Sequence, residues 1–223
     1  MDFVNIVRRK TQSARLYIQW LFGLAIVAAL VVVFAKLAED VWYREGFSWD
    51  LPILLAIHSL GNPILDTFMR FVTQTGVTGA IIIAIILAGW FIWRHRQIEA
   101  ITLLIAFGGA VAINSLLKLL FALPRPNLFP PLVVEDGFSF PSGHVTASVA
   151  VYGFLAVVLW QSKHYGWALL SGTWILMVAI SRIYLGVHYP SDTLAAIAFT
   201  SLWMIMVFFV KNGYVNSIKQ SSS

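Results

Sequence analysis

Three short segments of this chain carry residue types that can handle a phosphate group. One of them is Pro141-Ser142-Gly143-His144, which directly precedes an apolar run at Val145–Trp160. If that run is a helix, Ser142, Gly143 and His144 lie at its N-terminus, where unpaired backbone N–H groups and the helix dipole attract an anion. Gly143 lets the backbone approach a ligand, and His144 adds a titratable ring. Taken alone, the segment could instead be a Ser142 helix cap beside an incidental histidine.

The second segment, Lys118-x6-Arg125-Pro126, supplies two cations. Lys118 ends an apolar run, where an uncompensated charge is costly and usually functional. Arg125 lies between Pro124 and Pro126, and these prolines stiffen its loop. Two fixed cations suit an oxyanion, which the guanidinium of Arg125 can bind in bidentate fashion. Taken singly, either side chain could instead snorkel toward lipid headgroups.

The third segment begins at Ser181-Arg182 and ends with His188-x3-Asp192. Arg182 is a third cation. The four-residue spacing lets His188 and Asp192 meet if this part of the chain is helical or turn-like. A carboxylate bonded to one ring nitrogen leaves the other nitrogen free to attack phosphorus. The alternatives are a metal-binding pair, a structural hydrogen bond or, for Asp192, a helix cap.

Together the segments match the needs of phosphoryl transfer, which are neutralised oxygens, an in-line nucleophile and an acid for the leaving group. We expect His188 to be the nucleophile, Asp192 to orient it, and His144 to protonate the departing oxygen and later activate water. With three cations available, we expect no metal and no other cofactor, and the sequence has no Walker-type loop or paired-aspartate magnesium motif. The expected phosphate ligands are Lys118, Arg125, Ser142, Gly143 and Arg182.

The composition indicates that these segments are held by a membrane protein. Of the 223 residues, 59% are hydrophobic and 11% are charged, whereas soluble domains carry roughly 25% charged residues. The absence of cysteine excludes disulfides and thiolate chemistry. Six apolar runs approach or reach the length of a membrane span, and we predict that each is a helix because the bilayer offers the backbone no other partner. The runs are Leu16–Ala35, Val77–Trp93, Ile98–Phe121, Val145–Trp160, Trp167–Tyr184 and Thr193–Val210.

Successive spans alternate in direction, and this places all three segments at one membrane face. The third and fifth spans end there, and the fourth and sixth begin there, whichever way the protein is inserted. Basic residues favour cytoplasmic termini and an extracytoplasmic site. We therefore interpret the net charge of +5 as a topology signal, not as a nucleic-acid surface. The basic residues on the predicted inner side are Arg8, Arg9, Lys10, Arg15, Arg94, Arg96, Lys163, Lys211 and Lys219.

The remaining parts of the chain have simpler interpretations. Lys36–Gly76 contains a helix start at Asp50 and a break at Gly61-Asn62-Pro63, so we predict two short helices, either at the outer interface or as a buried hairpin over the bundle. Gly108-Gly109 and Asn114 are attributed to close helix packing. The expected fold is all-α, polytopic and a single domain over residues 1–223, with the motifs within 118–192.

The three segments resemble the signature motifs of the type 2 phosphatidic acid phosphatase superfamily. Lys118-x6-Arg125-Pro126, Pro141-Ser142-Gly143-His144 and Ser181-Arg182-x5-His188-x3-Asp192 match that pattern at every position. The chain looks most like the bacterial phosphatidylglycerophosphate phosphatase B group within it. The resemblance implies a metal-independent membrane phosphatase with the residue roles given above and an active site on the extracytoplasmic side.

A site near the outer interface suits a substrate with its phosphate at headgroup level and its tail in the bilayer. The candidate substrates are phosphatidylglycerol phosphate, phosphatidic acid and undecaprenyl diphosphate, with the tail admitted sideways between spans. The alternative functions are phosphate or phospholipid binding or transport without cleavage, which would need no nucleophile, and vanadate-dependent halide oxidation. The sequence leaves the physiological lipid and the oligomeric state open.

Overall fold

A computed structural model describes residues 3–221, with side chains described from Tyr17 onward except Gln19. The elements in this part of the chain are all helices, and six are long and apolar enough to span a membrane, which confirms the predicted fold class. The side chains of Arg8, Arg9, Lys10 and Arg15 lie outside the described residues. The spans are α1 (Phe3–Trp42), α3–η1–α4 (Pro63–Gln74, Thr75–Gly79, Ala80–Trp93), α5 (Gln97–Phe121), α6–η2–α7 (Gly143–Ser148, Val149–Gly153, Phe154–Gln161), α8 (Tyr165–Tyr184) and α9 (Pro190–Ser221).

The region between the first two spans differs in detail from the expectation. One short helix, α2 (Asp50–His58), stands by itself, but α3 continues through η1 into α4. The expected second short helix is therefore the first part of the second span, at the end nearest α2. Asn62 starts α3 by accepting a bond from the backbone N–H of Leu65 at 3.0 Å. The π-turn η1 carries the helix past Gly76, which the sequence had suggested as its boundary.

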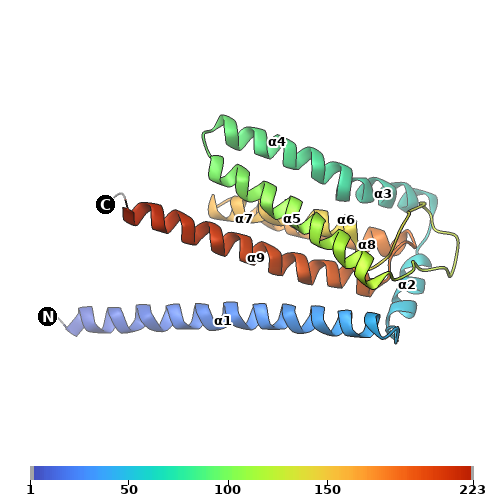
Figure 1. The fold of residues 1–223 in the computed structure, drawn as a ribbon, viewed down its shortest axis with the longest axis horizontal. Helices are drawn as coiled ribbons and strands as arrows, with labels where there is room; N and C mark the ends of the chain where they lie inside the picture. Colours follow the sequence, from blue (N-terminus) through green and yellow to red (C-terminus); the bar gives the residue numbers. More distant parts are fainter. Residues whose placement is uncertain (1–2, 222–223) are drawn as a thin grey trace.

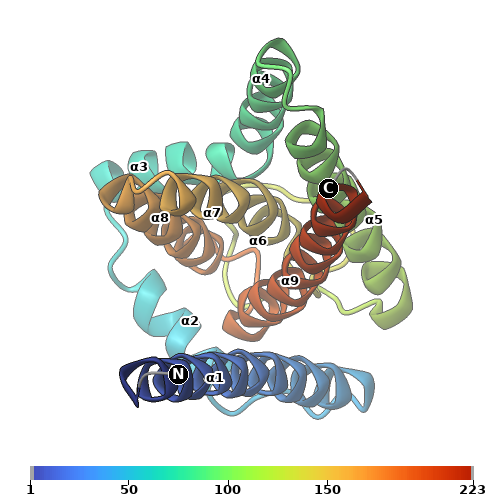
Figure 2. The same ribbon diagram turned by 90° about the vertical axis from the view of Figure 1, so that its left-hand side faces the viewer.

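The helices form a bundle in which α1 lies at the edge, packed along α9 (Figure 2). Small residues allow the central helices to approach one another closely. In the core between α4, α5, α7 and α9, the rings of Phe91 and Phe154 pack among several alanines. Both termini lie at one end of the bundle, while α2 and the long loop between α5 and α6 lie at the other end (Figure 1).

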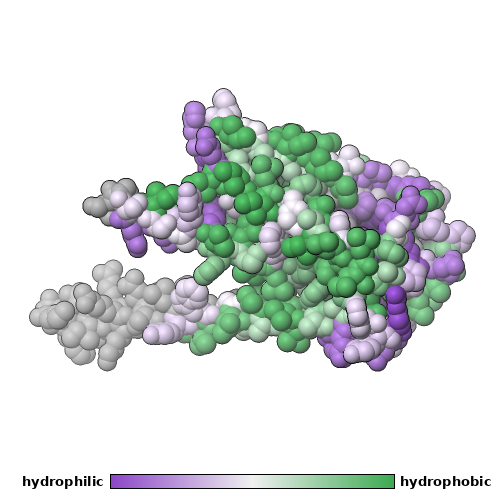
Figure 3. Space-filling view, viewed as in Figure 1, coloured by the Kyte–Doolittle hydropathy of each residue, from purple (hydrophilic) through white to green (hydrophobic). Residues whose placement is uncertain are grey.

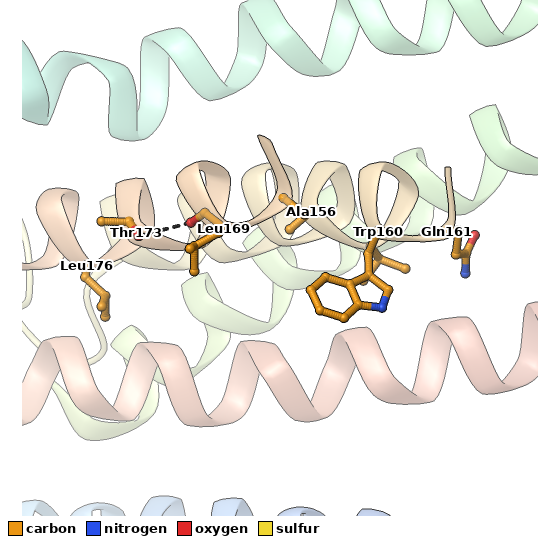
Figure 4. A pocket seen from close by; sticks show the side chains of 9 residues that line it. Ala156, Trp160, Gln161, Leu169, Thr173 and Leu176 are labelled. Carbon is orange, nitrogen blue, oxygen red and sulfur yellow. Dashed lines mark hydrogen bonds between the residues drawn. The ribbon is translucent and has the colours of Figure 1, made fainter. Parts of the chain in front are cut away.

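The surface carries a hydrophobic band between two more hydrophilic ends, as a bilayer-spanning protein requires (Figure 3). A groove of about 550 Å³ lies between α7 and α8 in the half of the bundle away from the three motifs. Figure 4 shows Trp160 and Leu169 on its apolar walls, where the hydroxyl of Thr173 donates to the Leu169 carbonyl at 3.0 Å. This groove contains no ionisable side chain and is not the site of chemistry.

Candidate active site

The three motifs meet at the end of the bundle that lies opposite the termini. α5 brings Lys118 to this end and stops at Phe121, since Ala122 adopts a left-handed conformation and its N–H bonds the Lys118 carbonyl at 2.9 Å. The loop that follows folds back over the site. The Lys118 ammonium donates to the Phe138 carbonyl and, at 3.2 Å, to the Ser139 carbonyl. The lysine therefore holds the loop as well as facing the site.

His188 and Asp192 form the expected pair at the start of α9. The Nδ1 atom of His188 lies 3.1 Å from the carboxylate of Asp192, which also accepts the Tyr189 backbone N–H at 2.8 Å. On the other side of the ring, Nε2 lies 3.2 Å from a guanidinium nitrogen of Arg125. Because a guanidinium only donates, Nε2 must be the unprotonated nitrogen, and Nδ1 carries the proton that faces Asp192.

The surroundings of His188 favour its neutral form. Its side chain is 1% exposed, and this burial, together with the charges of Arg182 and Arg125, lowers the pKa of His188 well below 6.5. The ring is therefore neutral at neutral pH, with its single proton on Nδ1 and a lone pair on Nε2. That is the state a histidine nucleophile needs.

Arg125 is fixed by backbone carbonyls on two sides. Its guanidinium donates to the carbonyl oxygens of Val187 at 2.9 Å, Asp136 at 3.0 Å and Gly137 at 3.1 Å. These bonds join the turn before α9 to the α5–α6 loop. They place a positive charge directly beside the free nitrogen of His188.

Arg182 and His144 share a carboxylate that we did not assign from the sequence. Arg182 is fully buried and donates to the hydroxyl of Thr73. Its Nη2 lies 2.7 Å from Glu135, whose carboxylate also lies 3.6 Å from both His144 Nε2 and Arg125 Nη2. Burial acts to raise the pKa of Glu135, but the charges of Arg182, His144 and Arg125 outweigh it and hold this pKa below its usual value.

Ser142 and Gly143 lie where the sequence placed them, at the N-terminus of α6. The N–H of Ser142 donates to the Asp192 carbonyl at 3.2 Å. Its hydroxyl makes no capping bond and, within residues 3–221, has no hydrogen-bond partner. The simple helix-cap alternative is therefore not what the structure shows. A Cβ added to Gly143 would lie 3.5 Å from Asn114 Oδ1 and 3.9 Å from Lys118 Cε, so only a small residue leaves this edge of the site open.

Two further residues of the site, Ser139 and Asn114, were not assigned to it from the sequence. Ser139 is buried, donates to Asp192, and lies 3.2 Å from Nδ1 of His188. Asn114, attributed above to helix packing, donates to the Pro141 carbonyl at 3.2 Å and to the Thr146 hydroxyl at 3.0 Å. It therefore holds the turn that presents Ser142 and His144. A buried amide in an apolar span was the available signal for Asn114.

Gly76 makes room for His144 from the second span. A Cβ at this position would lie 2.9 Å from Val178 Cγ1 and 3.2 Å from both Cβ and Cδ2 of His144. The π-turn η1 brings this glycine against the imidazole. Such turns often occur at functional sites.

All eight residues predicted for the site thus lie in one connected cluster. The contacts run from His188 to Arg125 at 3.2 Å, then through Glu135 to Arg182 at 2.7 Å and to His144 at 3.6 Å. Three cations, two imidazoles and the buried carboxylate of Asp192 can together neutralise a phosphate, attack it and protonate a leaving group.

Comparison with known proteins also relates this chain to phosphatases. The profile of the PAP2 superfamily matches residues 99–214. The chain is 34% identical to phosphatidylglycerophosphatase B of Bacillus subtilis (strain 168) over 86% of this chain and 96% of that protein. It is 30% identical to undecaprenyl-diphosphatase BcrC of the same organism over 65% of this chain and 75% of that protein.

Two solved structures share the fold. The crystal structure of a transmembrane PAP2-type phosphatidylglycerolphosphate phosphatase from Bacillus subtilis matches with a TM-score of 0.73 and 32% identity, over 86% of this chain and 96% of that one. Aquifex aeolicus LpxE matches with a TM-score of 0.62 and 22% identity, over 74% and 97%. At that identity LpxE supports the fold alone.

Proposed function

This chain belongs to the PAP2 superfamily, and on that premise we propose that it is a membrane lipid phosphatase that works through a phosphohistidine. The observation that carries the proposal is the orientation of His188. Its Nδ1 is held by Asp192 at 3.1 Å, while its unprotonated Nε2 faces the guanidinium of Arg125, where a phosphate would be bound. A binding protein or transporter would have no use for such an activated imidazole.

The reaction follows from these positions in two steps. Nε2 of His188 attacks phosphorus, the bond from phosphorus to the lipid oxygen breaks, and His144 donates a proton to that oxygen. Water then attacks the phosphohistidine with His144 as the base, which releases inorganic phosphate and restores both imidazoles. Lys118, Arg125 and Arg182 neutralise the phosphate oxygens throughout.

The proposed substrates are lipids with a terminal phosphate or diphosphate, such as phosphatidylglycerol phosphate, phosphatidic acid or undecaprenyl diphosphate. Relatives named for the first and last of these activities support this range. A cavity of about 760 Å³ lies beside the site, between the end of α1, α2 and the start of α9. Its lining includes Arg44, Tyr189 and Leu123. This mixture of polar and apolar residues suits a lipid headgroup with the first part of its tail.

The proposed placement is a cell-membrane enzyme with both termini in the cytoplasm and the site on the extracytoplasmic side. The distribution of basic residues supports this orientation. The termini and the site also lie at opposite ends of the bundle (Figure 1). We further propose that the whole chain acts as one catalytic unit.

Replacement of the nucleophile tests the function. We expect His188→Ala to lower phosphate release from a lipid panel by at least about a thousandfold, while the unfolding temperature in detergent stays close to that of the wild type. His164→Ala, at the start of α8 and away from the site, is the matched control and should keep full activity. Normal phosphate release by His188→Ala would rule out the nucleophile assignment.

Chelation tests the metal-free part of the mechanism. Because three side-chain cations supply the neutralising charge, we expect EDTA to leave the rate of phosphate release unchanged. Orthovanadate should inhibit, since it adopts the five-coordinate geometry of the transition state. A strict requirement for magnesium would contradict this mechanism.

A further inference from the structure

We propose that Glu135 is an internal occupant of the phosphate subsite, which the phosphate of the substrate must displace before His188 can attack. This inference rests on the proposed function and concerns the same site. It assigns to a residue outside the three motifs the role of setting how tightly the enzyme binds phosphate.

The contacts of Glu135 are those expected of a bound oxyanion. One oxygen lies 2.7 Å from Arg182 and 3.6 Å from His144, and the other lies 3.6 Å from Arg125. These are two of the cations and the acid that the mechanism assigns to the substrate. A phosphate and a carboxylate cannot both occupy this position, because two anions in one partly desolvated site repel each other.

The carboxylate only partly fills the site. Arg182 is fully buried, and within the described chain its Nε has no hydrogen-bond partner and its Nη2 only the ion-pair contact with Glu135. The buried hydroxyl of Ser142 is also unpaired there. Buried donors without acceptors are costly. A phosphate, with more oxygens than a carboxylate, can satisfy these groups as well as those that Glu135 now contacts.

The loop is built so that Glu135 can move while its neighbours stay in place. On one side, the N–H of Leu132 donates to the Leu185 carbonyl at 3.0 Å. On the other side, the carbonyls of Asp136 and Gly137 are held by Arg125. Glu135 therefore lies on a short span between two anchors, and its side chain, 23% exposed, can swing outward without unfolding the loop.

A second role for the same residue would be to orient His144 as the catalytic acid. The geometry favours displacement, because the distance to His144 is 3.6 Å, longer than a hydrogen bond, whereas the distance to Arg182 is 2.7 Å. The two roles predict opposite results. Loss of a competing anion tightens phosphate binding. Loss of an orienting group lowers kcat and leaves phosphate binding no tighter.

The test is calorimetric titration of inorganic phosphate into the detergent-solubilised full chain, which needs no turnover. We expect Glu135→Gln to bind phosphate at least about tenfold more tightly than the wild type, since one competing charge is removed from two arginines. Phosphate should also raise the unfolding temperature more in Glu135→Gln than in the wild type. Glu99→Gln is the matched control, because it removes a carboxylate that is 20% exposed and pairs with Arg96 at 2.9 Å at the other end of α5, and it should bind phosphate as the wild type does.

Unchanged or weaker phosphate binding by Glu135→Gln would overturn the inference. If that variant does not fold, Glu135→Asp draws the carboxylate back by one methylene and should still bind phosphate more tightly than the wild type; equal binding would count against the inference. A failure of the proposed function would be distinguishable from a failure of this inference. It would show as no phosphate release from any lipid by the wild type, whatever the titrations give.

Discussion

At the scale of single residues, the chemistry depends on which nitrogen of His188 is free. The carboxylate of Asp192 lies at Nδ1 and a guanidinium lies at Nε2, so the ring proton must be on Nδ1. Ser139 donates to the same carboxylate oxygen that faces the histidine. A buried carboxylate with several donors stays in place and keeps the ring aligned.

We predict that Ser139→Ala lowers kcat with little change in KM. A hydrogen bond to a charged group contributes about 1.5–3 kcal/mol, which corresponds to a decrease of roughly ten- to a hundredfold in rate. Ser139→Thr should restore much of the loss because it keeps a hydroxyl. Ser148→Ala is the control, since within residues 3–221 that buried hydroxyl has no partner. An effect on KM alone would contradict an alignment role for Ser139.

At the scale of elements, the helices are positioned by small residues and by buried polar clamps. Asp50, in the first turn of α2, accepts the N–H of Ser191 at 2.9 Å and its hydroxyl at 2.6 Å. This clamp fixes the start of α9 next to Asp192. Burial raises the pKa of Asp50, and the two bonds from Ser191 oppose that effect. α2 therefore supports the start of α9 from outside the membrane-spanning part of the bundle.

The glycine pair in α5 offers a matched test of helix packing. A Cβ at Gly109 would lie 2.2 Å from Cζ2 of Trp203 in α9, whereas a Cβ at Gly108 would meet nothing within 4 Å. We predict that Gly109→Ala lowers the free energy of unfolding by about 1–3 kcal/mol through overpacking, measured as a lower unfolding temperature in detergent. Gly108→Ala should unfold at the temperature of the wild type or slightly above it, because alanine is the better helix former and meets no neighbour there. Equal behaviour of the two variants would mean that α5 and α9 do not pack as described.

At the scale of the whole molecule, the site and the termini lie at opposite ends of a bundle with a hydrophobic girdle (Figures 1 and 3). The edge helix α1 packs along α9 and leaves most of its surface to lipid. A phosphate bound at this site would lie near one surface of the bilayer, with the apolar flanks of the bundle below it.

We predict that only the outer face of intact cells shows the activity. A phosphate ester that cannot cross the membrane should be hydrolysed by intact spheroplasts that make this protein, at a rate close to that of lysed spheroplasts. A C-terminal tag should be digested by protease only after lysis. Spheroplasts carrying His188→Ala are the control for other phosphatases. Activity that appears only after lysis would place the site on the cytoplasmic side.

The six spans, the convergence of Lys118, Arg125, His144 and His188, and the family could be predicted from the sequence alone. Hydropathy identifies the spans because only helical segments with mostly apolar side chains are stable in the hydrocarbon core of the bilayer. The alternating direction of the spans then decides which span ends lie at the same membrane face. These are local properties of the chain. The long continuous helix from α3 to α4 and the different environments of Gly108 and Gly109 were decided by packing, which depends on the face that each helix turns to its neighbours.

Glu135 and Ser139 could be found only in the tertiary structure. They lie in a loop without hydrophobic periodicity, so nothing in their spacing relates them to Arg182 or Asp192. Their positions follow from bonds between Arg125 and Lys118 and the loop carbonyls, which form only after the helices have packed. The sequence thus determined which charged and titratable side chains reach this end of the bundle. The folded loop decided that they contact the carboxylates of the site in this arrangement, because long-range electrostatic contacts leave no local pattern in the sequence.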